Sequence, residues 1–231
     1  MVNDDPTDYT GDVSPGGAPD VRRAGCLTVT KVAVDPDMSN NCYLLHCSET
    51  DERVLVDAAA EPERLLDLIG DGPLTSIVTT HQHWDHHRAL AAVKAAHPGA
   101  TVVAGGPDAD AIEEQTGVSV DRRVGAGDKV AVGTCDLHVI PLTGHTPGSI
   151  ALLLDEEAVS PHPHLFTGDS LFPGGPGRTT SPEDFTSLMD DLEEKVFGRL
   201  PDDTWFYPGH GNDSTLGAER ASLAEWRARG W

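Results

Sequence analysis

The chain has 231 residues, of which 38% are hydrophobic and 23% charged, so it can bury the core of one large globular domain. Its 38 acidic residues against 16 basic ones give a formal net charge of −22, which argues against nucleic acid and anionic membrane surfaces as partners. No apolar run approaches the roughly 20 residues of a membrane helix, and no basic, apolar leader is present, so we expect a cytoplasmic location.

Residues 1–24 are rich in Asp, Pro and Gly and lack periodicity, which predicts a flexible acidic N-terminal arm before a single domain over 25–231. Short β-branched, apolar runs then predict strands over 27–34, 42–47, 54–58, 74–80, 101–104, 129–132, 136–141, 150–155, 165–167 and 204–207. Helical periodicity predicts helices over 62–69, from 90 to the Pro-Gly pair at 98–99, over 107–115, from 182 to about 196, and over 218–229. This order of elements predicts an α/β fold, a four-layer αββα sandwich.

The strongest functional signal is the pattern HxHxDH over residues 81–86, directly after a predicted strand. Alternate side chains of an extended segment point the same way, so His81 and His83 can reach one cation. Asp85 and His86 follow where the chain turns into a helix and can face a second cation. A single histidine is usually structural, but four ligand-type side chains within six residues favour a metal site.

Three more ligand-type side chains lie at the ends of later predicted strands: His145 in GHTPGS, Asp169 in FTGDS and His210 in YPGHG. Each motif alone would usually be only a turn. Ligands grouped at the ends of several strands are what a rigid metal site requires. Two cations about 3.5–4 Å apart also need a bridging anionic ligand and more donors than one segment offers.

The motifs TTHQHWDH, GHTPGS, FTGDSLFPGG and YPGHG, in this order between about residues 27 and 211, resemble the metallo-β-lactamase fold superfamily. Within it the chain is similar to the glyoxalase II (hydroxyacylglutathione hydrolase) type. The resemblance implies two divalent cations, zinc first and iron or manganese as alternatives. It implies a first metal on His81, His83 and His145, a second on Asp85, His86 and His210, Asp169 as the bridge, and Asp57 orienting the HxHxDH loop.

The function implied by the resemblance is hydrolysis of a thioester, an acyl derivative of a low-molecular-weight thiol, by a metal-bridging hydroxide. Metal coordination lowers the pKa of water from 15.7 to about 7, which supplies a nucleophile at neutral pH. Asp85, which can steer the water, and Asp169 are the expected catalytic residues. A thiolate leaves with little protonation, so no further acid is needed. The expected partner is this small thioester, and the oligomeric state is not encoded.

Two features differ from the glyoxalase II pattern. Only 21 residues follow His210, so we expect the C-terminal helical domain that holds glutathione in that family to be missing. Arg178, in the loop over 175–178, matches the family's basic residue that contacts the carboxylate of the thiol, and it is the predicted substrate-binding residue. The family's aromatic residue two positions later is Thr180 here. Another thiol, such as mycothiol, is therefore an alternative to glutathione.

The main alternative function is that of a persulfide dioxygenase, an oxidoreductase that uses one iron on the equivalents of His81, His145 and Asp169. The YPGHG motif at the second metal position favours the hydrolase. A metal-binding protein without turnover is a third reading. β-Lactamases, lactonases and tRNA nucleases fit less well because of Asp169, because of Phe172 where lactonases have tyrosine, and because of the acidic charge.

The remaining histidines and the cysteines are expected to be structural. The four cysteines show no CxxC spacing, which predicts free thiols in the core. His87 lies beside the main motif and could contact substrate. The other histidines lack partners at ligand spacing: His46, His97, His138, His162 and His164.

Overall fold

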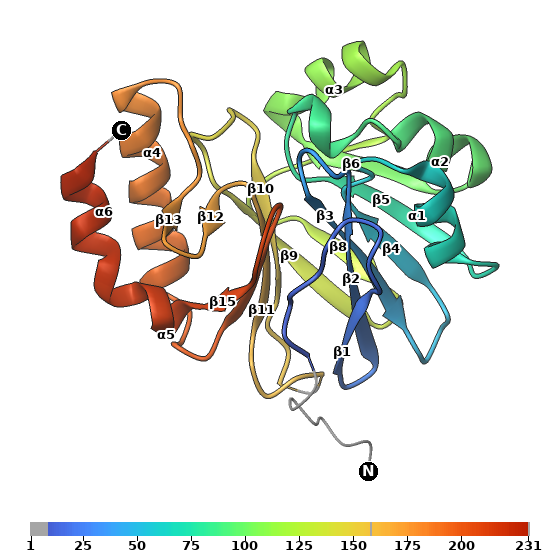
Figure 1. Ribbon diagram of the computed structural model, residues 1–231, viewed down its shortest axis with the longest axis horizontal. Coiled ribbons are helices and arrows are strands. Elements are labelled where there is room, and N and C mark those ends of the chain that lie inside the picture. Colours follow the sequence, from blue (N-terminus) through green and yellow to red (C-terminus); the bar gives the residue numbers. More distant parts are fainter. Residues whose placement is uncertain (1–8, 158, 231) are drawn as a thin grey trace.

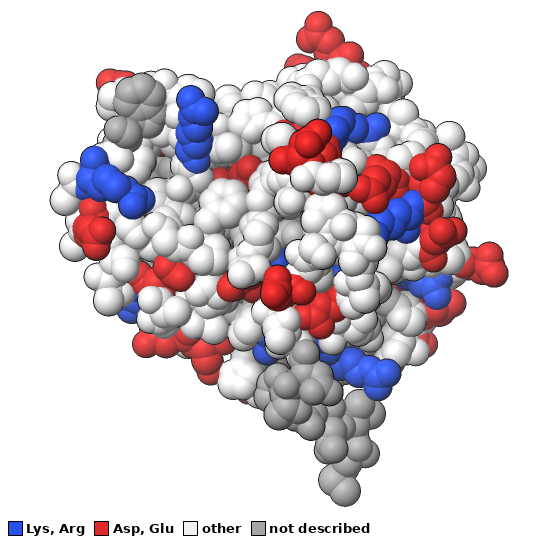
Figure 2. All heavy atoms as spheres, in the orientation of Figure 1, with Lys and Arg blue, Asp and Glu red and all other residues white. Residues whose placement is uncertain are grey.

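The structure is a computed structural model that describes residues 9–157 and 159–230. Two β-sheets lie face to face in the middle of the molecule, and helices cover the outer face of each (Figure 1). The four layers are the predicted αββα sandwich. On the face shown in Figure 2, acidic side chains are spread over the surface with fewer basic ones among them.

The N-terminal half of the chain builds the first sheet, whose seven strands lie side by side in sequence order. The strands from β1 to β4 are antiparallel, whereas β4 to β7 are parallel because a helix crosses over between each successive pair. The strands are β1 Asp20–Ala24, β2 Leu27–Val34, β3 Asn40–Cys47, β4 Arg53–Val56, β5 Leu74–Thr79, β6 Thr101–Gly105 and β7 Arg122–Val124. The crossover helices are α1 Pro62–Ile69, α2 Leu90–Ala96 and α3 Ala109–Thr116, with short 3₁₀ turns at Trp84–His86 and Gly106–Asp108.

The C-terminal half builds the second sheet, whose six strands lie in the order β15-β14-β11-β10-β9-β8. Its strands are β8 Lys129–Val132, β9 Cys135–Pro141, β10 Ile150–Leu154, β11 His164–Gly168, β14 Trp205–Pro208 and β15 Ser214–Thr215, and a small hairpin pairs β12 Leu171–Phe172 with β13 Gly175–Pro176. The helices of this half are α4 Pro182–Asp191, continued by a π-helical segment Leu192–Phe197, then α5 Leu216–Glu219, a 3₁₀ turn Arg220–Ser222 and α6 Leu223–Arg229. The final helix predicted over 218–229 is therefore interrupted.

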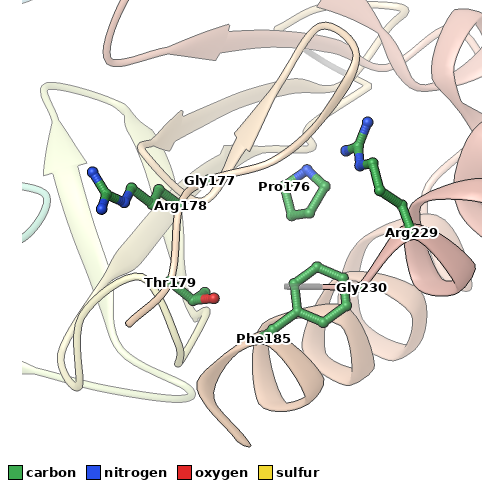
Figure 3. A pocket seen from close by; sticks show the side chains of 7 residues that line it. All are labelled: Pro176, Gly177, Arg178, Thr179, Phe185, Arg229 and Gly230. Carbon is green, nitrogen blue, oxygen red and sulfur yellow. The ribbon is translucent and has the colours of Figure 1, made fainter. Parts of the chain in front are cut away.

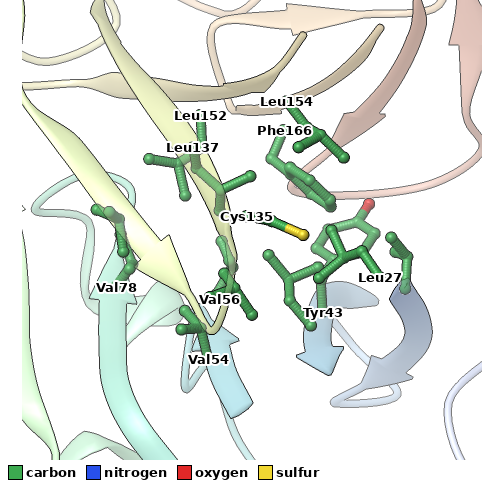
Figure 4. Packing of buried hydrophobic residues seen from close by; sticks show 14 of the residues in the cluster. Leu27, Tyr43, Val54, Val56, Val78, Cys135, Leu137, Leu152, Leu154 and Phe166 are labelled. Carbon is green, nitrogen blue, oxygen red and sulfur yellow. The ribbon is translucent and has the colours of Figure 1, made fainter. Parts of the chain in front are cut away.

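The apolar side chains form three clusters that correspond to the three interfaces between layers. The middle cluster joins the two sheets, with side chains such as Val54 and Val56 of β4 facing Leu137 of β9 and Leu152 of β10 (Figure 4). The two outer clusters lie between each sheet and its helices. Central strands are buried on both faces, which explains their continuous apolar runs in the sequence. No helix in the described part of the chain combines the length and apolar character that crossing a bilayer requires.

The N-terminal segment from Tyr9 onward is part of the folded domain, contrary to the predicted flexible arm over 1–24. Strand β1 pairs with β2 along its whole length, and Tyr9 is buried and donates a hydrogen bond from its hydroxyl to Asp213 (2.6 Å). Asp213 also pairs with the buried Lys31, whose Nζ donates to the carbonyl of Gly11 (2.7 Å). The segment is held by polar contacts and has no periodic pattern of apolar residues, so its composition alone did not reveal that it is folded. Residues 1–8 of the predicted arm lie outside the described residues.

Four loops that follow strands of the two sheets meet at one edge of the sandwich, after β5, β9, β11 and β14. The sheets are joined there by hydrogen bonds between β3 and the loop after β14. Asn41 N donates to the carbonyl of Gly209 (2.7 Å), and the Tyr43 hydroxyl donates to the carbonyl of Pro208 (2.6 Å). The predicted ligand motifs lie on these four loops.

Candidate metal centre

All seven predicted ligand side chains come together at this edge of the sandwich. The loop after β5 supplies four of them, and the loops of the second sheet supply three. They form three overlapping groups in which one ligand atom per residue lies within 4.8 Å of the others: His81, His83 and His145; His81, His86 and Asp169; Asp85, His86 and His210.

The HxHxDH loop is held in place by Asp57, the residue directly after β4. Asp57 has a positive φ of 58° and accepts hydrogen bonds from the backbone N–H and the hydroxyl of Thr80 (both 2.8 Å). It also accepts from Nδ1 of His86 (2.9 Å). Because the Thr80 hydroxyl donates to Asp57, it can accept from Nδ1 of His81, 3.1 Å away. The expected orienting role of Asp57 matches these contacts.

Two more imidazoles of the cluster are fixed in the same way. Nδ1 of His145 donates to the carbonyl of Arg178 (2.6 Å), and Nδ1 of His210 donates to the carbonyl of Met38 (2.9 Å). These hydrogen bonds assign the proton to Nδ1, so the lone pair of each Nε2 points into the cluster. Hydrogen bonds that fix the tautomer and orientation of a histidine are typical of metal ligands.

The inward-facing atoms fit a metal ion better than they fit one another. Nε2 of His81 lies 3.1 Å from Nδ1 of His83, and Nε2 of His86 lies 3.2 Å from Nε2 of His210. Two nitrogens bound tetrahedrally to one zinc ion are about 3.3 Å apart. In addition, Nε2 of His145 is buried without a hydrogen-bond partner among the described residues. Such orphaned acceptors are costly unless a ligand binds them.

Asp169 lies between the two halves of the cluster, where a bridging carboxylate would be needed. Its Oδ1 is 3.4 Å from Nε2 of His86, and its Oδ2 is 3.5 Å from Nε2 of His210 and 3.7 Å from Nε2 of His145. The backbone makes room for it at Gly209, because a Cβ there would lie 2.2 Å from Oδ1 of Asp169. The glycine before the histidine in YPGHG is thus required by close approach.

The electrostatics of the cluster favour a bound cation. Burial, together with the neighbouring imidazoles, lowers the pKa of His81, so this ring is neutral. Burial also opposes a charge on His86, but the carboxylates of Asp169 and Asp57 raise its pKa well above the ordinary value. The carboxylates therefore favour positive charge at the position where a metal ion would supply it.

Sequence reasoning missed two residues that hold the site together. Asp108, fully buried after β6, accepts hydrogen bonds from Gln82 N (2.9 Å), Thr146 Oγ1 (2.6 Å) and Gly148 N (2.6 Å). It thus connects the HxHxDH loop to the GHTPGS loop. The other is Asn40, whose side-chain amide donates to Oδ2 of Asp85 (2.9 Å). Asp57 directly follows the parallel strand β4 and Asp108 lies three residues after the end of β6, so a carboxylate just past a strand was the available signal.

Two predicted contact residues lie beside the cluster and not in it. Arg178 has an exposed side chain and lines a cavity of about 370 Å³. Figure 3 shows Arg178 and Arg229 on opposite sides of this cavity, with Phe185 and Pro176 between them. The cavity adjoins the cluster because the Arg178 carbonyl accepts from His145. His87 is buried, and its Nε2 donates to the carbonyl of Gln82 (3.2 Å).

Comparison with known proteins gives a consistent set of relatives. The family described as the Metallo-beta-lactamase superfamily matches residues 35–210. A hydroxyacylglutathione hydrolase from Polaromonas is 37% identical over 170 residues, which cover 73% of this chain and 60% of the relative. A mitochondrial persulfide dioxygenase from mouse, ETHE1, is 29% identical over 191 residues, which cover 81% of this chain and 70% of the relative.

A solved structure, that of the protein TTHA1623 in a di-iron-bound form, superposes with a TM-score of 0.66 at 30% identity. The match covers 82% of this chain and 96% of that one. By contrast, the chain spans only about 60% of the length of the hydroxyacylglutathione hydrolases that it matches first. The family match over residues 35–210 includes all four loops that carry the predicted ligands.

Proposed function

Because the chain belongs to the metallo-β-lactamase superfamily, we propose that it is a binuclear metallohydrolase that cleaves the thioester bond of an acylated low-molecular-weight thiol. The observation that carries the proposal is the second ligand group, Asp85, His86 and His210, directly beside the first. A mononuclear site would not need these three side chains. The similarity to hydroxyacylglutathione hydrolases supports hydrolysis as the reaction.

The donor set fits two divalent cations of the zinc, iron or manganese class, and zinc is the one we propose first. Such cations would acidify a bound water and polarise the carbonyl of the substrate. Asp169 reaches toward both ligand groups, which is the geometry of a bridge. Asp85, whose Oδ2 is held by Asn40, can accept a proton or orient a water molecule at the second group.

The cavity beside the cluster is the proposed binding region for the thiol carrier. Arg178 and Arg229 are both among the residues that line this cavity, together with Pro176 and Phe185, on a protein whose net charge is −22. A small thiol with an acidic group fits this combination, since a guanidinium pairs well with a carboxylate. Glutathione and mycothiol are both candidates for the carrier. The cytoplasmic location and the absence of nucleic acid and membrane partners stay predictions.

The proposal is tested by counting metals and then assaying turnover. Protein purified without added metal is analysed for its elements, and released thiol is measured with a panel of acyl derivatives of glutathione, mycothiol and other small thiols. We expect at least two divalent metals per chain and turnover of at least one thioester. Oxygen uptake with a persulfide substrate is measured in parallel and is expected to be absent.

The same experiment separates the alternatives. The persulfide dioxygenase among the relatives makes that activity the second candidate. One iron per chain with persulfide-dependent oxygen uptake would replace the hydrolase by the dioxygenase. A fully loaded protein without turnover in either assay would indicate a metal-binding protein.

A further inference from the structure

Three of the four cysteines lie together at the end of the sandwich opposite the histidine–aspartate cluster. Cys26 follows β1, Cys47 ends β3, and Cys135 begins β9, so the trio joins the two sheets. Strand β3 runs from one site to the other, because its first residue, Asn40, contacts Asp85 and its last residue is Cys47. At about 3.4 Å per residue, the two sites are roughly 24 Å apart.

The three sulfur atoms converge on one point in space. All three lie within 4.8 Å of one another, and Sγ of Cys26 is 3.1 Å from Sγ of Cys135. Cys47 and Cys135 are fully buried, whereas Cys26 is partly exposed and leaves a path from solvent. Figure 4 shows the sulfur of Cys135 directed into the core between the sheets. The fourth cysteine, Cys42, lies in the separate cluster under the helices.

We propose that Cys26, Cys47 and Cys135 form a second metal site, which binds a thiophilic cation such as Zn²⁺ through three thiolates. Thiolates bound to one zinc ion at about 2.3 Å are roughly 3.8–4.0 Å apart. That spacing lies between the 3.1 Å of the Cys26–Cys135 pair and the 4.8 Å within which all three sulfurs lie. Cys26 would have to move by about 0.7 Å from Cys135, and its partly exposed side chain permits this. The site is independent of the proposed hydrolase.

The surroundings of the trio supply polar contacts that a purely apolar core would lack. The hydroxyl of Thr134 lies 3.6 Å from Sγ of Cys47 and 3.9 Å from Sγ of Cys26, and it donates to the Glu49 carboxylate (2.9 Å). An oxygen ligand or a water molecule is thus available for a fourth position. Close packing is also required at Gly133, because a Cβ there would lie 2.6 Å from Sγ of Cys47.

Charge considerations agree with this geometry. Thiolates as close together as these three sulfurs would repel one another, and a bound cation would relieve this repulsion.

Cobalt substitution tests the site with a readout that the histidine–aspartate cluster cannot give. Reduced, full-length protein is stripped with a chelator and titrated with Co²⁺, whose thiolate complexes show a sulfur-to-metal charge-transfer absorption in the near ultraviolet. We expect about three Co²⁺ per chain and this absorption in the wild-type protein. Cys26→Ala, at the partly exposed position, should remove the absorption and lower the stoichiometry by one, and Cys47→Ala should do the same.

Two controls keep the result specific. Cys42→Ala, a buried cysteine on the same strand as Cys47 but outside the trio, should leave the absorption and the stoichiometry unchanged. Asp169→Ala should weaken cobalt binding at the histidine–aspartate cluster and keep the absorption. The proposal is overturned if wild-type protein binds Co²⁺ without the charge-transfer absorption. It is equally overturned if the reduced protein forms a Cys26–Cys135 disulfide in air and Zn²⁺ gives no protection.

Discussion

Strand β11 carries a buried histidine at its start and a partly buried aspartate just past its end, and their polar atoms are satisfied in different ways. His164, at the start, has both ring nitrogens in hydrogen bonds, with the Ser160 hydroxyl (3.0 Å) and the Tyr207 hydroxyl (2.8 Å). Asp169, past the end, has a buried oxygen with no hydrogen-bond partner among the described residues. The polar atoms of the first end are satisfied within the protein, whereas the second end presents an acceptor that a ligand could bind.

The difference teaches how to tell a structural histidine from a ligand in the same fold. His164 and His145 are both buried, and Nδ1 of each makes a hydrogen bond, with the Tyr207 hydroxyl and the Arg178 carbonyl respectively. Only His145 keeps a second, unpartnered nitrogen, and that nitrogen points toward other histidines. Burial alone therefore does not distinguish these two histidines, whereas the unpartnered Nε2 of His145 does.

The largest effect is expected from removing the unsatisfied carboxylate. Asp169→Ala should lower thioesterase turnover at least a hundredfold and reduce the metal content, because Oδ2 of Asp169 lies 3.7 Å from Nε2 of His145 in one ligand group and 3.5 Å from Nε2 of His210 in the other. His164→Gln, the change at the other end of the strand, should leave turnover per bound metal close to wild type. Near-normal turnover of Asp169→Ala would contradict the proposed role of Asp169 as a metal ligand.

His164, at the start of β11, should affect how the free energy of unfolding depends on pH. Burial, and to a smaller degree the charge of Arg22, lowers the pKa of His164 to about 3, so the folded protein resists the proton that the unfolded chain binds near pH 6.5. Above pH 6.5 this histidine is neutral in both states and does not change the free energy of unfolding. As the pH falls from 6.5 toward 3, the unfolded chain binds a proton that the folded protein does not, so the free energy of unfolding decreases. By pH 4.5 the loss from this residue is about 2–3 kcal/mol.

Metal-free protein is used for this measurement, so that metal release does not contribute. Denaturant unfolding of wild type and His164→Gln at pH 7 and pH 4.5 gives the difference directly. The variant should lose less stability than wild type between these two values. An equal loss in both proteins would show that His164 is not the group that resists protonation.

A smaller effect is expected from Asp108, which touches no predicted ligand side chain. Asp108→Asn replaces one carboxylate oxygen by an NH₂ group, which then faces either Gly148 N or the pair of Gln82 N and the Thr146 hydroxyl, all of which are donors. We expect a 10- to 100-fold loss of metal affinity at the His81, His83 and His145 group, the usual range for residues that support ligands. Titration with a competing chelator measures this loss. Thr116→Val, which removes a local hydroxyl contact on α3, serves as the control and should change nothing at the site.

The smallest effect is expected from Arg178→Gln, which removes an exposed charge and keeps the backbone carbonyl that accepts from His145. For a thioester whose carrier bears a carboxylate, KM should rise about fivefold with kcat nearly unchanged, because an exposed ion pair contributes about 1 kcal/mol. A neutral thioester should show no change. Arg199→Gln, at an exposed arginine outside this cavity, is the matched control. An equal KM effect in both variants would remove the assigned role.

Much of this architecture could be predicted from the sequence, because the strands are short apolar runs that end at turn residues. The helix over 62–69 was predicted with its observed bounds, since proline starts it and glycine ends it. Strands β1 and β7 were missed because each contains two adjacent arginines and has no apolar run. Both lie at an edge of the first sheet. Their existence depends on pairing with a distant neighbour, which no local pattern records.

The ligand cluster was predictable because its chemistry is concentrated in a few residue types at fixed spacing. The supporting residues were harder, because one buried aspartate looks like any other until its donors are known. Asp108 contacts residues 26 to 40 positions away, and Asn40 contacts one 45 positions away. Those separations are set by how the two sheets pack, and packing is what the sequence pattern leaves open.

The hydrogen bonds between β3 and the loop after β14 run across the boundary between the two sheets, at the edge where both contribute donor atoms. An ion bound there joins the first half of the chain to the second, so saturation with metal and resistance to unfolding become one equilibrium. At a free ion concentration one hundred times the dissociation constant, a single site adds about 2.7 kcal/mol. A cell short of metal would therefore hold this protein in a form that proteases degrade more readily, and its abundance would report the supply of the ion.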